Sequence, residues 1–168
     1  EDGGAISNYN GVTTQNQGYG NVTIKNSEFT DNSSGKRGGA IYGYSLAGLA
    51  ITDNPSLPNT TFSNNSGGTL GGAIHAGNSL ALDSITFNNN STVSQTDPSG
   101  RGGAIYAGKT LELTDCAFTE NSALNGGAVY ANSTLTLTGA NTFTRNSANA
   151  SGGAIYANQA MTVATDAA

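Results

Sequence analysis

The sequence predicts an all-β protein, a right-handed parallel β-helix (β-solenoid) of about five to six coils with roughly 25 residues each. Two short motifs that alternate along the chain carry this prediction. The tetrad Gly-Gly-Ala-Ile starts at Gly3, Gly38, Gly71, Gly102 and Gly152, with a valine version at Gly126. The motif Phe-x-x-Asn-Ser starts at all five phenylalanines: Phe29, Phe62, Phe87, Phe118 and Phe143. Self-similarity at such a short period is typical of solenoids.

A pair of aliphatic residues at i and i+2 lies between the two motifs in each repeat. The pairs are Val22/Ile24, Leu49/Ile51, Leu80/Leu82, Leu111/Leu113, Leu135/Leu137 and Met161/Val163. This alternation indicates strands with one buried face. We expect three short strands per unit, namely a tetrad strand, an aliphatic strand and a strand around Phe, followed by a turn that holds Asn-Ser. A propeller blade needs about 40 to 45 residues, so the 24 residues from Gly102 to Gly126 favour the solenoid.

Stacking of coils would turn each repeat position into a column of equivalent side chains. We expect the first tetrad glycine to permit a corner with positive φ and the second to permit close approach of neighbouring coils. Alternation then places the Ile/Val column and the Phe column in the core, and the Ala column on the outer face. The motif positions, which we expect to be mainly structural, are Gly38, Gly39, Ala40, Ile41, Gly71, Gly72, Ala73, Ile74, Gly102, Gly103, Ala104, Ile105, Gly126, Gly127, Ala128, Val129, Gly152, Gly153, Ala154, Ile155, Phe29, Asn32, Phe62, Asn65, Phe87, Asn90, Phe118, Asn121, Phe143 and Asn146.

The asparagines of the second motif are expected at a turn, because Asn tolerates the left-handed region and its amide can bond to the amide one coil away. The single cysteine, Cys116, lies two residues before Phe118, where the neighbouring repeat has Ile85. We therefore expect a reduced thiol that points inward. No His or Cys spacing around it indicates a catalytic or metal-binding thiol.

One further column, here called the aromatic column, directly follows the Ile/Val column and is expected to face outward. Its members are Tyr42, His75, Tyr106, Tyr130 and Tyr156. Two interpretations are open. The rings stack between coils and shield the sheet, or they form an exposed stripe that binds a protein or carbohydrate partner, since aromatic rings supply contact area at small entropic cost.

Composition excludes several classes of function. The net charge is −5 and the six basic residues are scattered, which argues against a nucleic-acid partner. We expect no cofactor and no metal, because repeats of the calcium-binding solenoid type are absent. There is no long apolar stretch, and residues 1–4 do not resemble a signal peptide. Any export signal or membrane anchor is expected outside this sequence.

The repeats run through residues 1–168 as one unit, with coils that start near residues 3, 38, 71, 102, 126 and 152. Three insertions, Ser7–Gly20, Asp53–Pro58 and Thr92–Gly100, are expected to form surface loops, where function often lies. The terminal coils would expose unpaired backbone groups, so we also expect end-to-end self-association.

The repeated GGAI(Y) and FxxN motifs resemble those of the polymorphic outer-membrane proteins, the chlamydial autotransporter adhesins. The resemblance covers essentially the whole chain. It implies a passenger segment displayed on the bacterial cell surface or secreted, which attaches to a host-cell protein or glycan and reaches the membrane only through a C-terminal barrel outside this sequence. In that family both motifs are implicated in adhesion, whereas their positions here indicate core and corner roles.

Two other functions stay open. One is a structural spacer that lifts another domain off the surface. The other is a β-helix polysaccharide lyase or hydrolase, since one fold hosts many functions. Its candidate acids are Asp53 and Asp115, in one corner column two coils apart with Asp83 between them, and about 10 Å of separation is at the edge of inverting geometry. No Arg or Lys column accompanies them, so we expect no enzyme.

Overall fold

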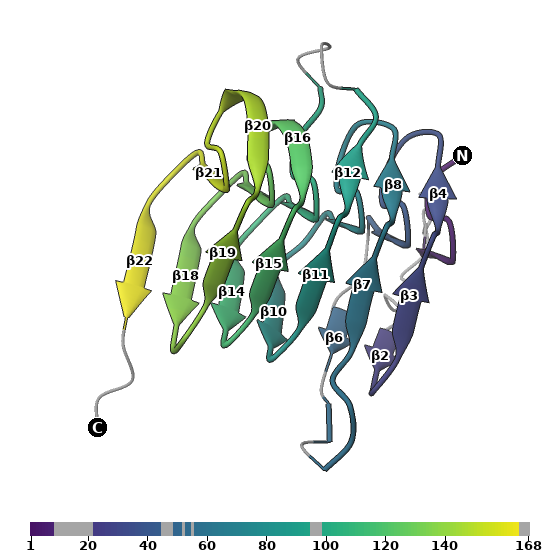
Figure 1. Ribbon diagram of the computed structural model, residues 1–168, viewed down its shortest axis with the longest axis vertical. Coiled ribbons are helices and arrows are strands. Elements are labelled where there is room, and N and C mark those ends of the chain that lie inside the picture. The colour runs from purple at the N-terminus through teal and green to yellow at the C-terminus, as the bar shows by residue number, and fades with distance from the viewer. Residues whose placement is uncertain (9–21, 45–48, 52, 55, 95–98, 165–168) are drawn as a thin grey trace, which may run out of the picture.

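The computed structural model describes residues 1–8, 22–44, 49–51, 53–54, 56–94 and 99–164, which form a parallel β-solenoid (Figure 1). A complete coil contributes one strand to each of four parallel sheets, and the described residues contain no helix. Accordingly, no described segment could cross a membrane as a helix. Successive coils lie side by side along the rod from the N-terminal to the C-terminal end. The predicted all-β parallel β-helix is confirmed.

Two sheets contain the strands expected from the tetrad and from the aliphatic pairs. The tetrad sheet consists of β1 (Ile6–Asn8), β5 (Ile41–Gly43), β9 (Ile74–Ala76), β13 (Ile105–Ala107), β17 (Val129–Ala131) and β21 (Ile155–Ala157). The aliphatic sheet consists of β2 (Val22–Ile24), β6 (Leu49–Ile51), β10 (Leu80–Asp83), β14 (Leu111–Thr114), β18 (Leu135–Thr138) and β22 (Met161–Ala164). The aliphatic strands β10, β14 and β18 show the expected alternation of buried and more exposed residues, whereas the tetrad strands β5, β9 and β17 are buried at every position.

Two further sheets follow in each coil. The phenylalanine sheet consists of β3 (Glu28–Thr30), β7 (Thr61–Ser63), β11 (Thr86–Asn88), β15 (Ala117–Thr119) and β19 (Thr142–Thr144). The serine sheet consists of β4 (Ser33–Ser34), β8 (Ser66–Gly67), β12 (Ser91–Thr92), β16 (Ser122–Asn125) and β20 (Ser147–Ser151). The prediction of three strands and an Asn-Ser turn was wrong on this point, because the serine N–H groups bond to the asparagine carbonyls of the preceding coil and continue the ladder.

The strand register pairs equivalent repeat positions of neighbouring coils. Ile74 pairs with Ile41 and Ile105, and Phe87 pairs with Phe62 and Phe118. The phenyl rings stack with centroids 4.8 to 5.0 Å apart and planes within 8° of parallel. The predicted phenylalanine column is therefore confirmed as a continuous stack in the core.

The tetrad glycines perform the two tasks expected of them. Gly38 and its equivalents have φ between +58° and +74°, a region that favours glycine. A Cβ on Gly39 would collide with the carbonyl oxygen of Gly72 in the next coil, and the same clash recurs from coil to coil. Any side chain at the second glycine would therefore push neighbouring coils apart.

The core contains one column that sequence alternation misplaced. In the inner coils the Ile/Val, aliphatic and phenylalanine columns are buried as expected. Ala40, Ala73, Ala104 and Ala128 are also fully buried and belong to the same cluster. The outward prediction for alanine was wrong because the strand begins only at the following isoleucine. The preceding bend, where Ala40 N and Ile41 N both donate to the carbonyl of Ala73, breaks the alternation.

Candidate functional site

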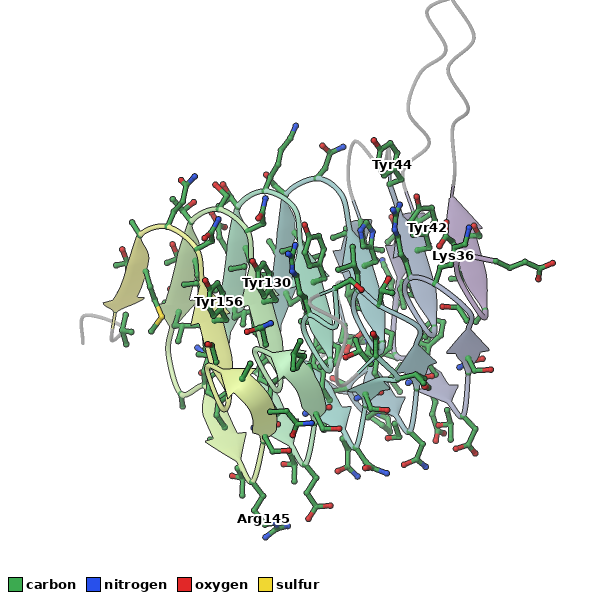
Figure 2. All side chains as sticks on the ribbon, turned by 90° about the horizontal axis from the view of Figure 1, so that it is seen from above. Lys36, Tyr42, Tyr44, Tyr130, Arg145 and Tyr156 are labelled. Carbon is green, nitrogen blue, oxygen red and sulfur yellow. The ribbon has the colours of Figure 1, made fainter. Side chains whose placement is uncertain are left out.

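The members of the aromatic column pair in register along the tetrad sheet. Tyr42, Tyr130 and Tyr156 are labelled in Figure 2. The ring centroids of the column lie 4.8 to 5.5 Å apart from Tyr42 to Tyr156, with His75 as second member. None of its members belongs to the hydrophobic core cluster. The interpretation in which the rings stack between coils and shield the sheet agrees with this geometry.

The side chains of the aromatic column are less exposed than expected for side chains on the outer face of the rod. Tyr42, His75 and Tyr130 are buried, with exposed fractions of 1%, 4% and 7%, while Tyr106 and Tyr156 are half-buried. Neighbouring rings cover one another, so a side chain that lies outside the core cluster can still be shielded from water. The interpretation as an exposed stripe therefore does not hold for these three members.

Two arginines pack against the column. The Arg37 guanidinium donates to the hydroxyl of Tyr42 at 3.5 Å, and Cζ of Arg101 lies 5.1 Å from the ring centroid of Tyr130. The second contact is a cation–π pair. Burial raises the pKa of both tyrosines, and each arginine opposes the rise in the tyrosine that it contacts.

His75 is the one titratable ring of the column near neutral pH. Burial lowers its pKa to about 4, and the positive charge of Arg37 acts in the same direction. Its Nδ1 has no hydrogen-bond partner among the described residues. The imidazole therefore stays neutral at neutral pH and behaves as an aromatic ring in the stack.

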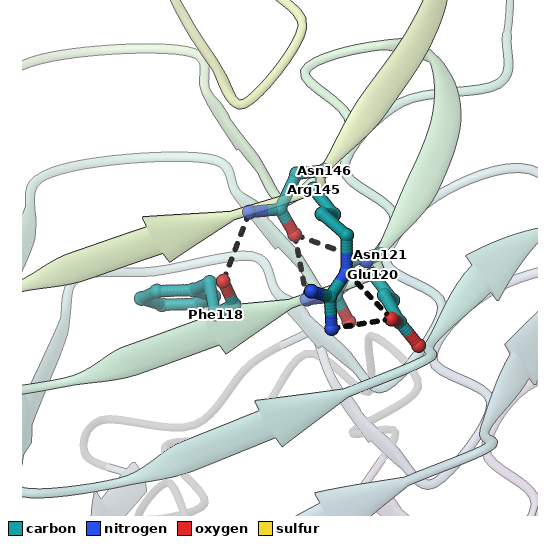
Figure 3. A network of polar contacts seen from close by, with 5 residues as sticks. All are labelled: Phe118, Glu120, Asn121, Arg145 and Asn146. Carbon is teal, nitrogen blue, oxygen red and sulfur yellow. Dashed lines mark hydrogen bonds and ion pairs between the residues drawn. The ribbon is translucent and has the colours of Figure 1, made fainter.

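The asparagine ladder, Asn32, Asn65, Asn90, Asn121 and Asn146, links the coils at the corner between the phenylalanine and serine sheets. Oδ1 of Asn146 accepts from N (3.0 Å) and Nδ2 (2.9 Å) of Asn121, while its Nδ2 donates to the carbonyl of Phe118 at 2.9 Å (Figure 3). The same three bonds recur in the preceding coils. Amide-to-amide bonding between coils is confirmed.

The left-handed residue at this corner is the one before each ladder asparagine. Positive φ occurs at Asp31, Asn64, Asn89, Glu120 and Arg145. The expectation that the ladder asparagines themselves take this conformation was wrong, because they must turn their amides inward. The side chains of two of these corner residues, Glu120 and Arg145, point to solvent and form an exposed ion pair at 2.7 Å, which contributes little to stability.

Cys116 lies in the core, as expected. Its thiol is fully buried and donates to the carbonyls of Thr114 at 3.2 Å and Leu82 at 3.7 Å. Burial raises its pKa to about 11, so the thiolate needed for nucleophilic or metal chemistry is scarce at neutral pH.

The acidic candidates for glycan cleavage have structural contacts. Asp53 accepts hydrogen bonds from the backbone N of Thr60 and of Asn26 and from the hydroxyl of Thr60. Burial alone would raise the pKa of Asp53, but these bonds together lower it, which is the opposite of a general acid.

The other two candidate acids, Asp83 and Asp115, lie at different register positions near the ends of the aliphatic strands. Asp115 accepts from the backbone N of Ala140 at 2.6 Å. Asp83 pairs in register with Thr114, so it lies one residue outside the corner column that contains Asp115. No cluster of three His, Cys, Asp or Glu residues suited to a metal occurs in the described part of the chain.

Sequence reasoning missed three exposed apolar side chains at positions where the repeat pattern stops. Tyr44, 52% exposed, follows β5 and stacks 6.3 Å from Tyr42, Leu57 lies in the Asp53–Pro58 insertion, and Val93 lies in the Thr92–Gly100 insertion. Their signal was available, since each is a large apolar residue where the repeat pattern stops. Residues 9–20 of the Ser7–Gly20 insertion lie outside the described residues.

The chain is a repeat β-solenoid with four parallel sheets. Its motif residues hold neighbouring coils together, because equivalent side chains stack on one another and the ladder asparagines bond from coil to coil. The signature of the Chlamydia polymorphic membrane protein repeat matches residues 26–44, 59–77, 84–108, 115–132 and 142–158. The chain therefore belongs to this family, which is associated with the outer membrane and the cell surface. No curated protein and no solved structure matches the chain.

Proposed function

We propose that the chain is a passenger segment of a surface-displayed or secreted bacterial adhesin, which attaches to a protein or glycan on host cells. Membership of the polymorphic membrane protein repeat family supports display at the surface. The rod supports attachment by presenting side chains at fixed spacing on a rigid scaffold.

The partner contacts residues outside the repeat motifs. The core phenylalanines Phe62, Phe87 and Phe118 and the ladder asparagine Asn90 are fully buried, so they offer no area to a partner. Three of the large apolar side chains that are exposed, Tyr44, Leu57 and Val93, instead lie beside or within departures from the repeat. We call these three the insert side chains. The exposure of all three at positions where the repeat is interrupted is the observation that carries the proposal.

The Asp53–Pro58 insertion is fixed to the preceding coil. The side chain of Asn26 accepts from Asn54 N at 3.0 Å and donates to the carbonyls of Asn54 (3.2 Å) and Pro58 (2.9 Å). Leu57 is thereby presented by an anchored loop, which reduces the ordering cost of binding.

The half-buried rings of Tyr106 and Tyr156 offer a second contact area on the aromatic column. Rings of this kind are frequent anchors at interfaces. The aromatic column is thus retained as a candidate partner-binding surface, limited to its half-buried members.

The test is attachment of labelled protein to cultured host cells. Replacing Tyr44, Leu57 and Val93 by serine should weaken attachment at least about tenfold, since interface anchors commonly contribute more than about 1 kcal/mol each. A matched control replaces three exposed threonines, Thr142, Thr144 and Thr162, by serine and should bind like the parent.

A folded insert variant that attaches at parental strength would overturn the insert contact. The double change of Tyr106 and Tyr156 to serine would then locate attachment on the aromatic column. Absence of attachment by the parent itself would favour the spacer, and turnover of a glycan panel would favour the lyase or hydrolase.

A further inference from the structure

Positive charge is concentrated on one side of the rod, here called the tetrad face. It consists of strands β5, β9, β13, β17 and β21 with the turns on both sides of them, residues 35–44, 68–79, 99–110, 124–134 and 149–160. These residues include no acid and four cations, Lys36, Arg37, Arg101 and Lys109. The tetrad face thus carries +4 in a chain of net charge −5, so all other residues together carry −9. The expectation that the basic residues are scattered is wrong for these four.

The acids of the described coils lie on the remaining sides of the rod. They belong to the aliphatic and phenylalanine strands or to the turns next to them, and they are Glu28, Asp31, Asp53, Asp83, Glu112, Asp115 and Glu120. Glu1 and Asp2 lie in the coil before the tetrad face begins. No described carboxylate lies within ion-pair distance of the four cations, since the ion pair of the described residues joins Glu120 to Arg145. The tetrad face is therefore the side of the rod that attracts an anionic partner.

Two of the cations form a column along the rod. Arg37 and Arg101 occupy the same register position two coils apart, because each is bridged to Leu70 of the coil between them. At ordinary strand spacing their backbones are about 10 Å apart. An extended polysaccharide advances by about one coil per sugar, so a chain with an acidic group on every second sugar repeats its charge over a similar length. The arginine column therefore matches the charge spacing of such a chain.

The aromatic column holds both arginines in place. The guanidinium of Arg37 donates to the hydroxyl of Tyr42 at 3.5 Å, and Cζ of Arg101 lies 5.1 Å from the ring centroid of Tyr130. Stacking uses the face of a guanidinium and leaves the N–H donors in its plane available to an anion. Both arginines are half-buried, so binding costs them less conformational entropy than it costs a fully exposed side chain. They are pre-organised donors for sulfate or carboxylate oxygens.

The rest of the tetrad face is polar. Tyr44 is the one large, exposed apolar side chain that the described residues place on it. The turns after the tetrad strands present amides and hydroxyls, as Asn132, Ser133 and Thr134 do after β17. Protein interfaces centre on large aromatic or apolar anchors that become buried. A surface of hydrogen-bonding groups and cations with few such anchors therefore suits a sugar chain better than a protein.

We propose that the tetrad face binds a linear acidic polysaccharide of the host-cell surface, which lies along the rod so that Arg37 and Arg101 each contact one of its anionic groups. Lys36 and Lys109, both exposed, add positive charge at the two edges of the face. This inference rests on the proposed function, because it names the partner of the second contact area on the aromatic column.

The test measures binding of the purified chain to a heparin oligosaccharide by titration calorimetry. Replacing Arg37 and Arg101 together by glutamine should raise the dissociation constant at least about tenfold, since both charge-assisted contacts are lost. The matched control, Lys25→Gln with Arg145→Gln, removes the same charge from the other sides of the rod and should bind like the parent. Lys36→Gln with Lys109→Gln changes only exposed side chains and should weaken binding severalfold, so the face is tested even where the arginine variant does not fold.

Circular dichroism verifies that each variant is folded, and a salt series adds a second readout. The affinity of the parent should fall more steeply with sodium chloride than that of the arginine variant, because the parent releases more counterions. A folded arginine or lysine variant that binds heparin like the parent would overturn the proposal. The same conclusion follows from a control variant that binds as weakly as the arginine variant, or from a parent that binds polyglutamate as tightly as heparin.

Heparin binding is measured without cells, so the two proposals fail separately. A parent that attaches to host cells but does not bind heparin contradicts the polysaccharide and leaves the adhesin proposal standing. A parent that binds heparin through the tetrad face but does not attach to cells contradicts the adhesin and supports the polysaccharide site.

Discussion

Replacing His75 by tyrosine should remove an acid-sensitive step in the stability of the rod. The imidazole is buried within a stack whose other members are tyrosines, and burial lowers its pKa from an ordinary value of 6.5 to about 4. Folding therefore requires the neutral ring. When the pH falls below 6.5 the unfolded chain takes up a proton that the folded chain refuses, so stability decreases as pH falls from 6.5 towards 4.

The magnitude follows from the two pKa values. A shift of about 2.5 units corresponds to roughly 3 kcal/mol once the pH is below both values. Between pH 7 and pH 5 the expected loss is about 2 kcal/mol from this group. Tyrosine does not ionise in this range, so His75→Tyr lacks this contribution while keeping a ring in the stack.

The measurement is urea unfolding of the parent and of His75→Tyr at pH 7, 6 and 5. Carboxylates such as Asp53 also respond to acid, but they are common to both proteins, so the difference between the two stability curves isolates His75. The difference should change in favour of the variant by about 2 kcal/mol from pH 7 to pH 5. Parallel curves would refute the burial of a neutral imidazole.

Phe118→Ala should destabilise the fold by about 3 to 5 kcal/mol, as expected for a fully buried phenyl ring, whereas Phe143→Ala, at the half-buried end of the stack, should cost less. Equal losses in thermal or urea unfolding would contradict the stacked core. Cys116 should resist thiol reagents in native buffer and react only on unfolding, because burial raises its pKa to about 11. Rapid native labelling, followed by mass spectrometry, would show that the thiol is accessible.

The repeats made the fold predictable because stacking depends on features that sequence periodicity records directly. Each Phe must lie on the next Phe, and each second tetrad glycine must leave room for a carbonyl of the next coil. The regular recurrence of both motifs, Phe87 and Gly72 among them, was therefore enough to predict the stacking even though the intervals between copies differ. The inward position of Cys116 followed from the same register.

The remaining details depend on backbone geometry that spacing does not record. Ala40 entered the core because a bend precedes its strand, and Ser66 joined a fourth sheet through its bond to Asn32. Low exposure of Tyr42 arises from neighbouring rings, which alternation cannot report. The insert side chains lie where the repeats are interrupted. The periodicity that predicted the core therefore could not predict their exposure.

Host-cell attachment is carried either by the repeat motifs or by the side chains at irregular positions. The most direct way to distinguish these two possibilities is to measure host-cell attachment of a variant that alters a motif but keeps the fold. Phe118→Leu breaks the Phe-x-x-Asn motif but retains an apolar side chain in the core, and circular dichroism confirms folding. If the motifs act by holding coils together, this variant attaches like the parent, while the variant with serine at Tyr44, Leu57 and Val93 loses attachment. A folded Phe118→Leu that fails to attach, beside an insert variant that attaches fully, would contradict that assignment.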